Sequence, residues 1–166
     1  MRIEWFGQSA FKLSSGEATV FIDPFGDMSA LAAIASEHDD VAGTARGPNT
    51  IFVFALDGLR VAHFGDFGQA ALRDEQAAAV GEVDVLIVPV GGGPTVGADQ
   101  ARAIVERLAP KWVVPMHYRT PRIGFLETEE AFLALLSDVR RIEATSFETG
   151  ALAVGDGPAV VVPAVP

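Results

Sequence analysis

The chain has 166 residues, a formal net charge of −10 at pH 7 and no cysteine. This length suits one domain over residues 1–166 and can bury a core without disulfide bonds. The negative charge disfavours nucleic acids and anionic membranes as partners, and an anionic small-molecule substrate would need a local positive feature such as a metal. Because no thiolate is available, any metal ion must be bound by His, Asp or Glu side chains.

Two further features bear on the location of the protein. The sequence contains no run of 18 or more apolar residues, so we predict no membrane-spanning helix. The first residues, MRIEWFGQSAF, lack the apolar region and the cleavage site of a signal peptide. Together with the absence of cysteine, these features predict a cytoplasmic protein.

The first half of the chain is rich in strand patterns. Apolar residues on both sides of the turn SSGE predict two strands within residues 3–25. Asp57-Gly58 is a tight-turn signal between two apolar runs, which predicts a hairpin. The expected elements are therefore two strands within 3–25, a short apolar piece at 29–35, a loop at 36–49, and hairpin strands at 51–55 and 59–63.

The second half alternates helices and strands. The continuous apolar run at 83–90 is typical of a strand that is buried on both faces. Strand hairpins followed by strand–helix alternation predict an α/β (α+β) fold in which helices cover sheets. The expected elements are a helix in LRDEQAAAVGE that ends near Gly81, the strand 83–90, a helix capped near 97–99 and stopped by Pro110, a strand at 112–115, an amphipathic helix in TEEAFLALLSDV with Thr128 as N-cap, and one or two strands in the tail.

Two polar residues follow predicted strands. Asp66 stands between Gly65 and Phe67-Gly68, and these glycines allow a sharp turn that would expose its carboxylate. Its alternative role is to cap the next helix. His117 follows the strand in KWVVPMHYRTP, at an end where α/β sheets gather ligand sites. Its alternative is a structural histidine.

The two other histidines give weaker signals. His38 lies in SEHDD, where adjacent acids raise a histidine's pKa and oppose metal binding unless they take part in it. A solvated loop is its simpler interpretation. His63 lies on the strand before Asp66 and could lie near the site, although a packed or partly exposed strand histidine is the simpler interpretation. The loop GGGPTVGAD is a weak phosphate signal without a Walker lysine, and no G-x-S-x-G motif supports serine catalysis.

The order of these motifs resembles the metallo-β-lactamase-fold superfamily. The resemblance rests on IEWFGQSAF, VFIDPF, SEHDDVAGTARGPNTIFVFALDGLRVAHFGDFG, VDVLIVPVGGGPTVGADQA and PKWVVPMHYRTP. It is strongest to the bacterial metal-dependent hydrolase branch related to L-ascorbate-6-phosphate lactonase. The resemblance implies an αββα sandwich with the site at one edge between the sheets.

The resemblance also implies roles for individual residues. His38 and His117 would be metal ligands, and Asp66 would bridge two metals and carry the catalytic role. Asp23 would orient the ligand loop. Zinc or manganese ions suit such ligands, and a metal-bound hydroxide would attack a small ester, lactone or phosphate-bearing substrate. Beside His117, Tyr118 and Arg119 could orient an anionic substrate or be ordinary surface residues.

The chain departs from the family in its main ligand motif, H-x-H-x-D-H, which is absent. SEHDDV imitates this motif, but it fits better as the later segment that carries one ligand histidine. The missing segment would then join near Ala33-Ile34, and Gln8 stands where many relatives have His. We therefore expect two ions in a complete relative, and one or none here.

This departure leaves several alternatives open. Either the molecule has residues that this sequence does not show, or a real deletion leaves the sandwich incomplete near residues 26–36. A real deletion would require a partner to cover the gap. The protein is then a metal-dependent hydrolase, a catalytically degenerate binding module, or a structural subunit of a homo-oligomer that buries the incomplete face.

Overall fold

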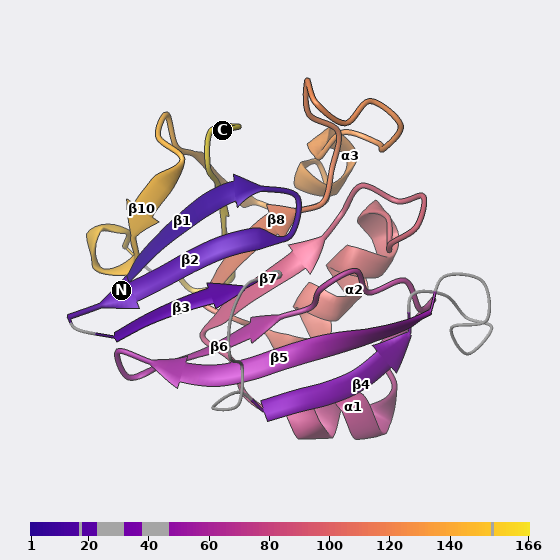
Figure 1. The fold of residues 1–166 in the computed structure, drawn as a ribbon, viewed down its shortest axis with the longest axis horizontal. Helices are drawn as coiled ribbons and strands as arrows, with labels where there is room; N and C mark the ends of the chain where they lie inside the picture. The colour runs from indigo at the N-terminus through magenta and orange to yellow at the C-terminus, as the bar shows by residue number, and fades with distance from the viewer. Residues whose placement is uncertain (17, 23–31, 38–46, 154) are drawn as a thin grey trace.

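The computed structural model describes residues 1–16, 18–22, 32–37, 47–153 and 155–166. Its strands form two sheets that face each other, and helices lie behind the larger sheet (Figure 1). This is the α/β arrangement that the sequence predicts. The smaller sheet has the order β10-β1-β2-β3, with β1 at Arg2–Gly7, β2 at Ala10–Ser15, β3 at Ala18–Ile22 and β10 at Ser146–Glu148.

The larger sheet has seven strands in the order β4-β5-β6-β7-β8-β11-β9. Its strands are β4 at Ala32–Glu37, β5 at Pro48–Leu56, β6 at Leu59–His63, β7 at Val85–Pro89, β8 at Trp112–Met116, β9 at Asp138–Arg141 and β11 at Ala159–Val162. The helices are α1 at Asp74–Val80, α2 at Ala98–Leu108 and α3 at Glu130–Leu133, with a 3-10 turn at Thr149–Ala151. Among the described residues, these helices are too short to cross a membrane.

The smaller sheet is explained by the alternation of buried and less buried residues along β1 and β2. Ile3, Trp5, Phe11 and Leu13 are buried and face the larger sheet, while their neighbours in sequence are less buried. The prediction of two strands in this region was wrong, because β1, β2 and β3 form a three-stranded meander. The pattern around SSGE signals one reversal, and the chain also reverses at the turn between β1 and β2.

The hairpin of β5 and β6 is the prediction that the structure confirms most closely. Asp57 and Gly58 have φ angles of 59° and 71°, the two left-handed conformations that match the twist of paired strands. Strand β6 occupies the predicted residues. Strand β5 begins earlier than predicted, at Pro48, because β4 pairs with its first half. The predicted loop at 36–49 is therefore wrong at both ends, where residues 36–37 and 48–49 lie in strands.

Strand β4 bears on the predicted missing segment. The join expected at Ala33-Ile34 lies inside β4, which pairs with β5 from Ala32 to Glu37 without a shift of register. Helix α1 lies next to this strand (Figure 1). The part of the 26–36 region that the structure describes, residues 32–36, thus belongs to a regular edge strand.

The C-terminal third differs from the sequence prediction. The helix expected in TEEAFLALLSDV is limited to α3, and its N-cap is Glu129 instead of Thr128. Residues 138–141 form β9, because Val139 pairs with Val160 of β11 in a parallel ladder. Tertiary pairing therefore overrides the local helical pattern. Strand β10, which was not predicted, pairs with β1.

The parallel strands bring the loops of interest to one edge. Strands β6, β7 and β8 are parallel neighbours, with His63 opposite Ile87 and Pro89 opposite Met116. Every residue of β7 and β8 is buried, as predicted for the 83–90 run. The loops after these three strands start at one edge of the sheet, where α/β folds place ligands.

Candidate metal centre

Asp66 and His117 meet at this edge. Asp66 lies on the loop after β6 and His117 directly follows β8. The Oδ1 atom of Asp66 lies 3.6 Å from Nε2 of His117, and their side chains are 36% and 12% exposed. The structure therefore brings together two of the three predicted ligands from positions 51 residues apart in sequence, and leaves both accessible. His38 and Asp23 lie outside the described residues.

Asp66 is held by Ser9 of the β1–β2 turn and by Asn49 of β5. The hydroxyl of Ser9 donates to Oδ1 of Asp66 over 2.9 Å. The backbone N–H of Asp66 donates to Oδ1 of Asn49 over 2.9 Å, and Nδ2 of Asn49 donates to the carbonyl of Phe64 over 2.9 Å. Asn49 therefore holds the backbone of the loop, while Ser9 orients the carboxylate itself.

His63 supports the same loop from inside the core. The N–H of Gly65 donates to Nδ1 of His63 over 3.1 Å, so Nδ1 carries the lone pair and Nε2 carries the proton. Nε2 then donates to the carbonyl of Ser9 over 2.9 Å. Both ring nitrogens are thus engaged by backbone groups. His63 is the packed strand histidine that the sequence indicates, and it links the Ser9 turn to the Asp66 loop.

The buried His63 gives a testable pH dependence. Burial lowers the pKa of its imidazole from 6.5 to about 4, although the hydrogen bond to Ser9 and the charge of Asp66 act in the opposite direction. The unfolded chain therefore binds this proton near pH 6.5, and the folded chain only near pH 4. The free energy of unfolding is expected to fall by about 3 kcal/mol between these pH values.

Urea unfolding at about pH 7, 6 and 5 measures this dependence. Carboxylates also contribute to it in acid, so a His63→Gln variant, whose amide can still donate to Ser9, serves as the reference. The wild type should lose more stability than this variant on acidification. If the wild type and His63→Gln lose equal stability on acidification, folding does not lower the pKa of His63.

His117 is held in an unusual backbone conformation. Its φ angle is 52°, in the left-handed region that non-glycine residues seldom occupy. The N–H of Gly91 donates to the carbonyl of His117 over 3.1 Å, which fixes this conformation from the neighbouring loop. A Cβ atom at Gly91 would lie 2.3 Å from that carbonyl oxygen, so only glycine fits there. Such supported strain is typical of functional sites.

The loop GGGPTVGAD contacts the Asp66 loop. The N–H of Val96 donates to the carbonyl of Phe67 over 2.9 Å. Thr95 is buried, and its hydroxyl donates to the carbonyl of Gly92. These donors are used within the protein. The loop therefore connects the segments that carry Asp66 and His117.

Tyr118 and Arg119, predicted to orient the substrate, lie in different surroundings. Tyr118 is 1% exposed, and its ring lies 5.3 Å from that of Trp5. Burial raises the pKa of its hydroxyl, which has no hydrogen-bond partner among the described residues. Arg119 is exposed, and its Nε donates to the carbonyl of Leu126 over 2.6 Å. Arg119 remains accessible to an anion, whereas Tyr118 contacts the core.

The donors present fit part of a metal site. One imidazole and one carboxylate are the ligand types that zinc and manganese accept. Within the described parts of the chain, no group of three or more His, Asp or Glu side chains is gathered for a metal ion. Asp66 and His117 could therefore supply two ligands of a metal site, which would need at least one more.

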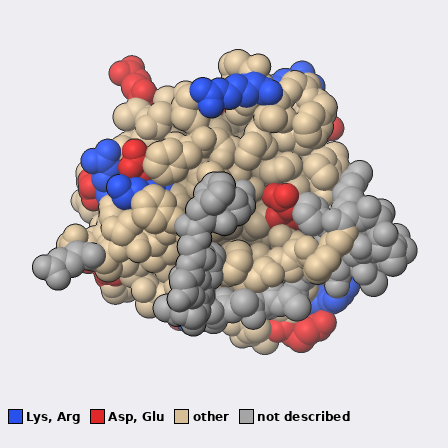
Figure 2. Space-filling model, viewed as in Figure 1, with Lys and Arg blue, Asp and Glu red and all other residues tan. Residues whose placement is uncertain are grey.

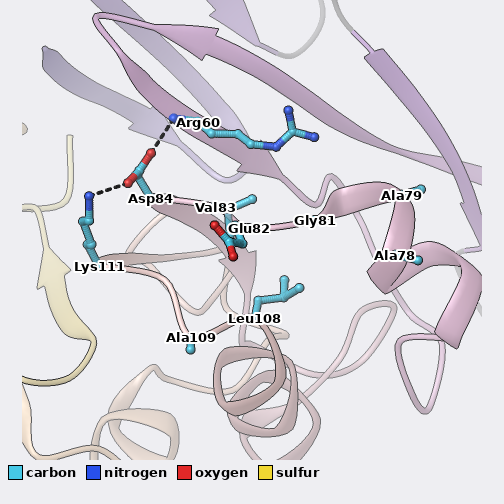
Figure 3. Close-up of a pocket in the computed structure, with 10 residues that line it drawn as sticks. All are labelled: Arg60, Ala78, Ala79, Gly81, Glu82, Val83, Asp84, Leu108, Ala109 and Lys111. Carbon is cyan, nitrogen blue, oxygen red and sulfur yellow. Dashed lines mark hydrogen bonds and ion pairs between the residues drawn. The ribbon is translucent and has the colours of Figure 1, made fainter.

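A cleft lies at the end of the larger sheet opposite to Asp66 and His117. It has a volume of about 850 Å³ and is formed where β7 and β8 begin and where α1 and α2 end (Figure 3). Three of its charged residues are engaged with one another: Asp84 accepts from Lys111 over 2.7 Å and from the N–H of Arg60 over 2.7 Å. Arg60 in turn donates to the carbonyl of Val80. Apart from Glu82, the charged residues of this cleft therefore take part in contacts within the fold.

The surface charge near the sheets is modest. On the face seen in Figure 2, uncharged side chains cover most of the surface, and Lys and Arg side chains lie toward its margins. An anionic substrate would therefore need a local cation, as the net charge of −10 also requires.

Sequence reasoning missed Ser9 and Asn49. Both stand within quoted motifs, GQSAF and GPNT, but neither is a residue type that indicates a metal ligand. The signal that could identify them is their position. Gly7 and Gln8, with φ angles of 103° and 48°, form the turn before Ser9. Asn49 follows Gly47-Pro48 at the start of β5.

Comparisons with known proteins show the family to which the chain is similar. A family described as the beta-lactamase superfamily domain matches residues 27–117. A UPF0173 metal-dependent hydrolase of Thermococcus kodakarensis is 41% identical over 91 residues, which are 52% of this chain and 38% of that protein. One from Pyrococcus abyssi is 38% identical over 95 residues, 55% of this chain and 40% of that protein. In these matches, the chain thus spans about two fifths of its curated relatives.

Solved structures confirm the fold. A protein of the metallo-beta-lactamase superfamily from Thermotoga maritima superposes with a TM-score of 0.82 and 27% identity over 99% of both chains. A protein from Parabacteroides distasonis gives a TM-score of 0.59 at 15% identity, over 99% of this chain and 93% of that one. The described residues therefore have the metallo-β-lactamase-type fold expected from the sequence.

Proposed function

Because the chain belongs to the beta-lactamase superfamily, we propose that it is a metal-dependent hydrolase of the UPF0173 type. The observation that supports this most is the approach of Asp66 and His117 at the ends of β6 and β8. His38 would complete the ligand set. The Thermococcus kodakarensis relative is named a metal-dependent hydrolase, and the Thermotoga maritima protein is proposed to depend on zinc.

The residues of this chain would have separate roles in binding the metal and the substrate. Asp66 and His117 would hold the ion, and a bound Zn²⁺ or Mn²⁺ would supply Lewis acidity toward an ester, lactone or phosphate-bearing substrate. Ser9 fixes the direction of the Asp66 carboxylate, and the strained backbone of His117 fixes its imidazole. Arg119 beside the site can attract an anionic group. We propose one ion, since the described residues gather two ligands.

Several finer assignments belong to the same proposal. The substrate is a small molecule, and neither nucleic acid nor membrane is a partner of this acidic chain. The cytoplasmic location expected from the sequence stays a prediction. A relation to L-ascorbate-6-phosphate lactonase would make a phosphorylated lactone the first substrate to assay. Asp23, before the 24–31 segment, would orient the His38 region.

The test combines metal content with activity. The purified protein is stripped with EDTA, reloaded with Zn²⁺ or Mn²⁺, and analysed by mass spectrometry for bound metal. Hydrolysis of aryl esters, lactones and phosphoesters is then measured for both forms. We expect stoichiometric metal and hydrolysis only in the loaded form. A folded protein that takes up no metal would refute the proposal.

The alternative is a catalytically degenerate module. The absence of a third ligand among the described residues favours it. Such a protein would bind metal weakly, hydrolyse none of these substrates and retain its fold. If it acts as an oligomeric subunit, its sedimentation coefficient should fall on dilution, as expected for association by mass action.

A further inference from the structure

A small apolar groove is lined by residues that lie close in sequence to Ser9 and His117. Its volume is about 190 Å³, and it lies between the turn that joins β1 to β2, the turn at 120–123 and residues 165–166. Clefts that hold whole small molecules measure about 300–1,000 Å³, so this groove suits a single substituent. Its walls include Phe6, Gln8, Thr120, Arg122, Ile123 and Val165.

Both main walls of the groove extend from the loops that carry the site. Gln8 directly precedes Ser9, whose hydroxyl donates to Asp66. Thr120 follows His117 by three residues, and its backbone pairs with that of Ile123 through hydrogen bonds of 3.1 and 3.0 Å. This closed turn and the β1–β2 turn thus connect the groove walls to the segments that carry His117 and Ser9.

The walls are apolar and exposed. Phe6 and Val165 are 49% and 44% exposed, and both are among the large hydrophobic residues that the described surface leaves accessible. Exposed apolar side chains that border a groove mark binding sites more often than isolated ones do. An aromatic or aliphatic substituent would cover them and remove their apolar surface from water.

Among the described residues that line the groove, Arg122 has the only charged side chain. No hydrogen bond or ion pair joins it to another described residue, whereas Arg107, Arg119 and Arg140 donate to carbonyl or carboxylate oxygens. A guanidinium pairs well with one carboxylate through two parallel hydrogen bonds. In a chain of net charge −10, such a cation beside an apolar groove favours a monoanion there.

We propose that this groove is a substrate subsite for an apolar substituent that carries a carboxylate, which pairs with Arg122. The assignment rests on the proposed hydrolase function for the identity of the molecule as a substrate. The scissile bond would lie toward Asp66 and His117, and the carboxylate would lie at the outer end of the groove. Arg122 is then a specificity-determining residue and takes no part in bond cleavage.

Binding alone tests the subsite without requiring hydrolysis. The EDTA-stripped protein is titrated with phenylacetate and with the neutral phenylacetamide, and amide shifts are followed by ¹H–¹⁵N NMR. Shifts should concentrate at Gly7, Gln8, Thr120 and Ile123. Phenylacetate should bind about fivefold more tightly than phenylacetamide, the effect of one exposed ion pair. Arg122→Gln should remove this preference, while Arg102→Gln on α2 should preserve it.

A second variant and an ester pair complete the test. Phe6→Ala should weaken both ligands, because it removes apolar wall that they share. The two esters are the para-acetoxy derivatives of phenylacetate and of phenylacetamide, which differ only in the charge of the group that would meet Arg122. In the metal-loaded protein, Arg122→Gln should weaken the apparent affinity for the charged ester, seen as a higher KM. The KM for the neutral ester and the kcat for both should stay unchanged.

The outcomes separate the subsite from the hydrolase function. Shifts outside the groove, or equal affinity of the wild type for phenylacetate and phenylacetamide, would overturn the subsite. Groove binding without any hydrolysis would support the subsite and refute the hydrolase function alone.

Discussion

Asp66→Asn is expected to reduce metal affinity and metal-dependent hydrolysis by more than about 100-fold. Partners that only orient a ligand already contribute 10–100-fold, and Asp66 is the carboxylate that faces His117. The amide removes the charge but retains the shape, so the fold should persist. Zn²⁺ affinity is measured by competition with a chromophoric chelator, and hydrolysis with the ester that the wild type cleaves.

Two further variants distinguish ligation from general loss of charge. Asp99→Asn, in the first turn of α2, removes the same charge from an exposed residue and should leave both quantities unchanged. Ser9→Ala removes only the hydrogen bond to Oδ1 and should produce an intermediate loss of about 10–100-fold in metal affinity. Wild-type affinity in Asp66→Asn would show that this carboxylate is not a ligand.

Gly91→Ala is expected to destabilise the protein by about 3 kcal/mol. Its Cβ atom would lie 2.3 Å from the carbonyl oxygen of His117 and 2.7 Å from the Cα atom of Tyr118. These are backbone atoms at the end of a buried strand, so no side-chain rotation can relieve the overlap. Overpacking of this kind costs about 1–3 kcal/mol or more. Urea unfolding measures the change.

The same substitution should also displace His117. Metal affinity should therefore fall together with stability, even though Gly91 offers no ligand. Gly124→Ala is the matched control, since no atom lies within 4 Å of the added Cβ, and its stability should change by less than about 0.5 kcal/mol. If Gly91→Ala unfolds at the same urea concentration as the wild type, the close approach of Gly91 to His117 and Tyr118 does not constrain the fold.

Local sequence patterns were sufficient to predict much of the larger sheet and two of the helices. The hairpin at Asp57-Gly58, helices α1 and α2, and the buried strands β7 and β8 were all predicted within a few residues of their bounds. Each has a signal inside its own segment: a turn dipeptide, a helical period or an unbroken apolar run. The helix that contains α3 was predicted too long, and β9 and β10 were not predicted, because pairing with β11 and β1 decides the conformation of these two strands.

The candidate site was likewise predictable from the sequence only in part. The sequence alone determined that Asp66 and His117 follow strands, because glycine, apolar runs and residue type are local properties. Only the tertiary structure decided that these two side chains meet, that Ser9 and Asn49 hold Asp66, and that His63 is enclosed by backbone groups. These contacts join residues 17 to 57 positions apart. Hydrogen bonds over such separations depend on strand order and register, which no local pattern contains.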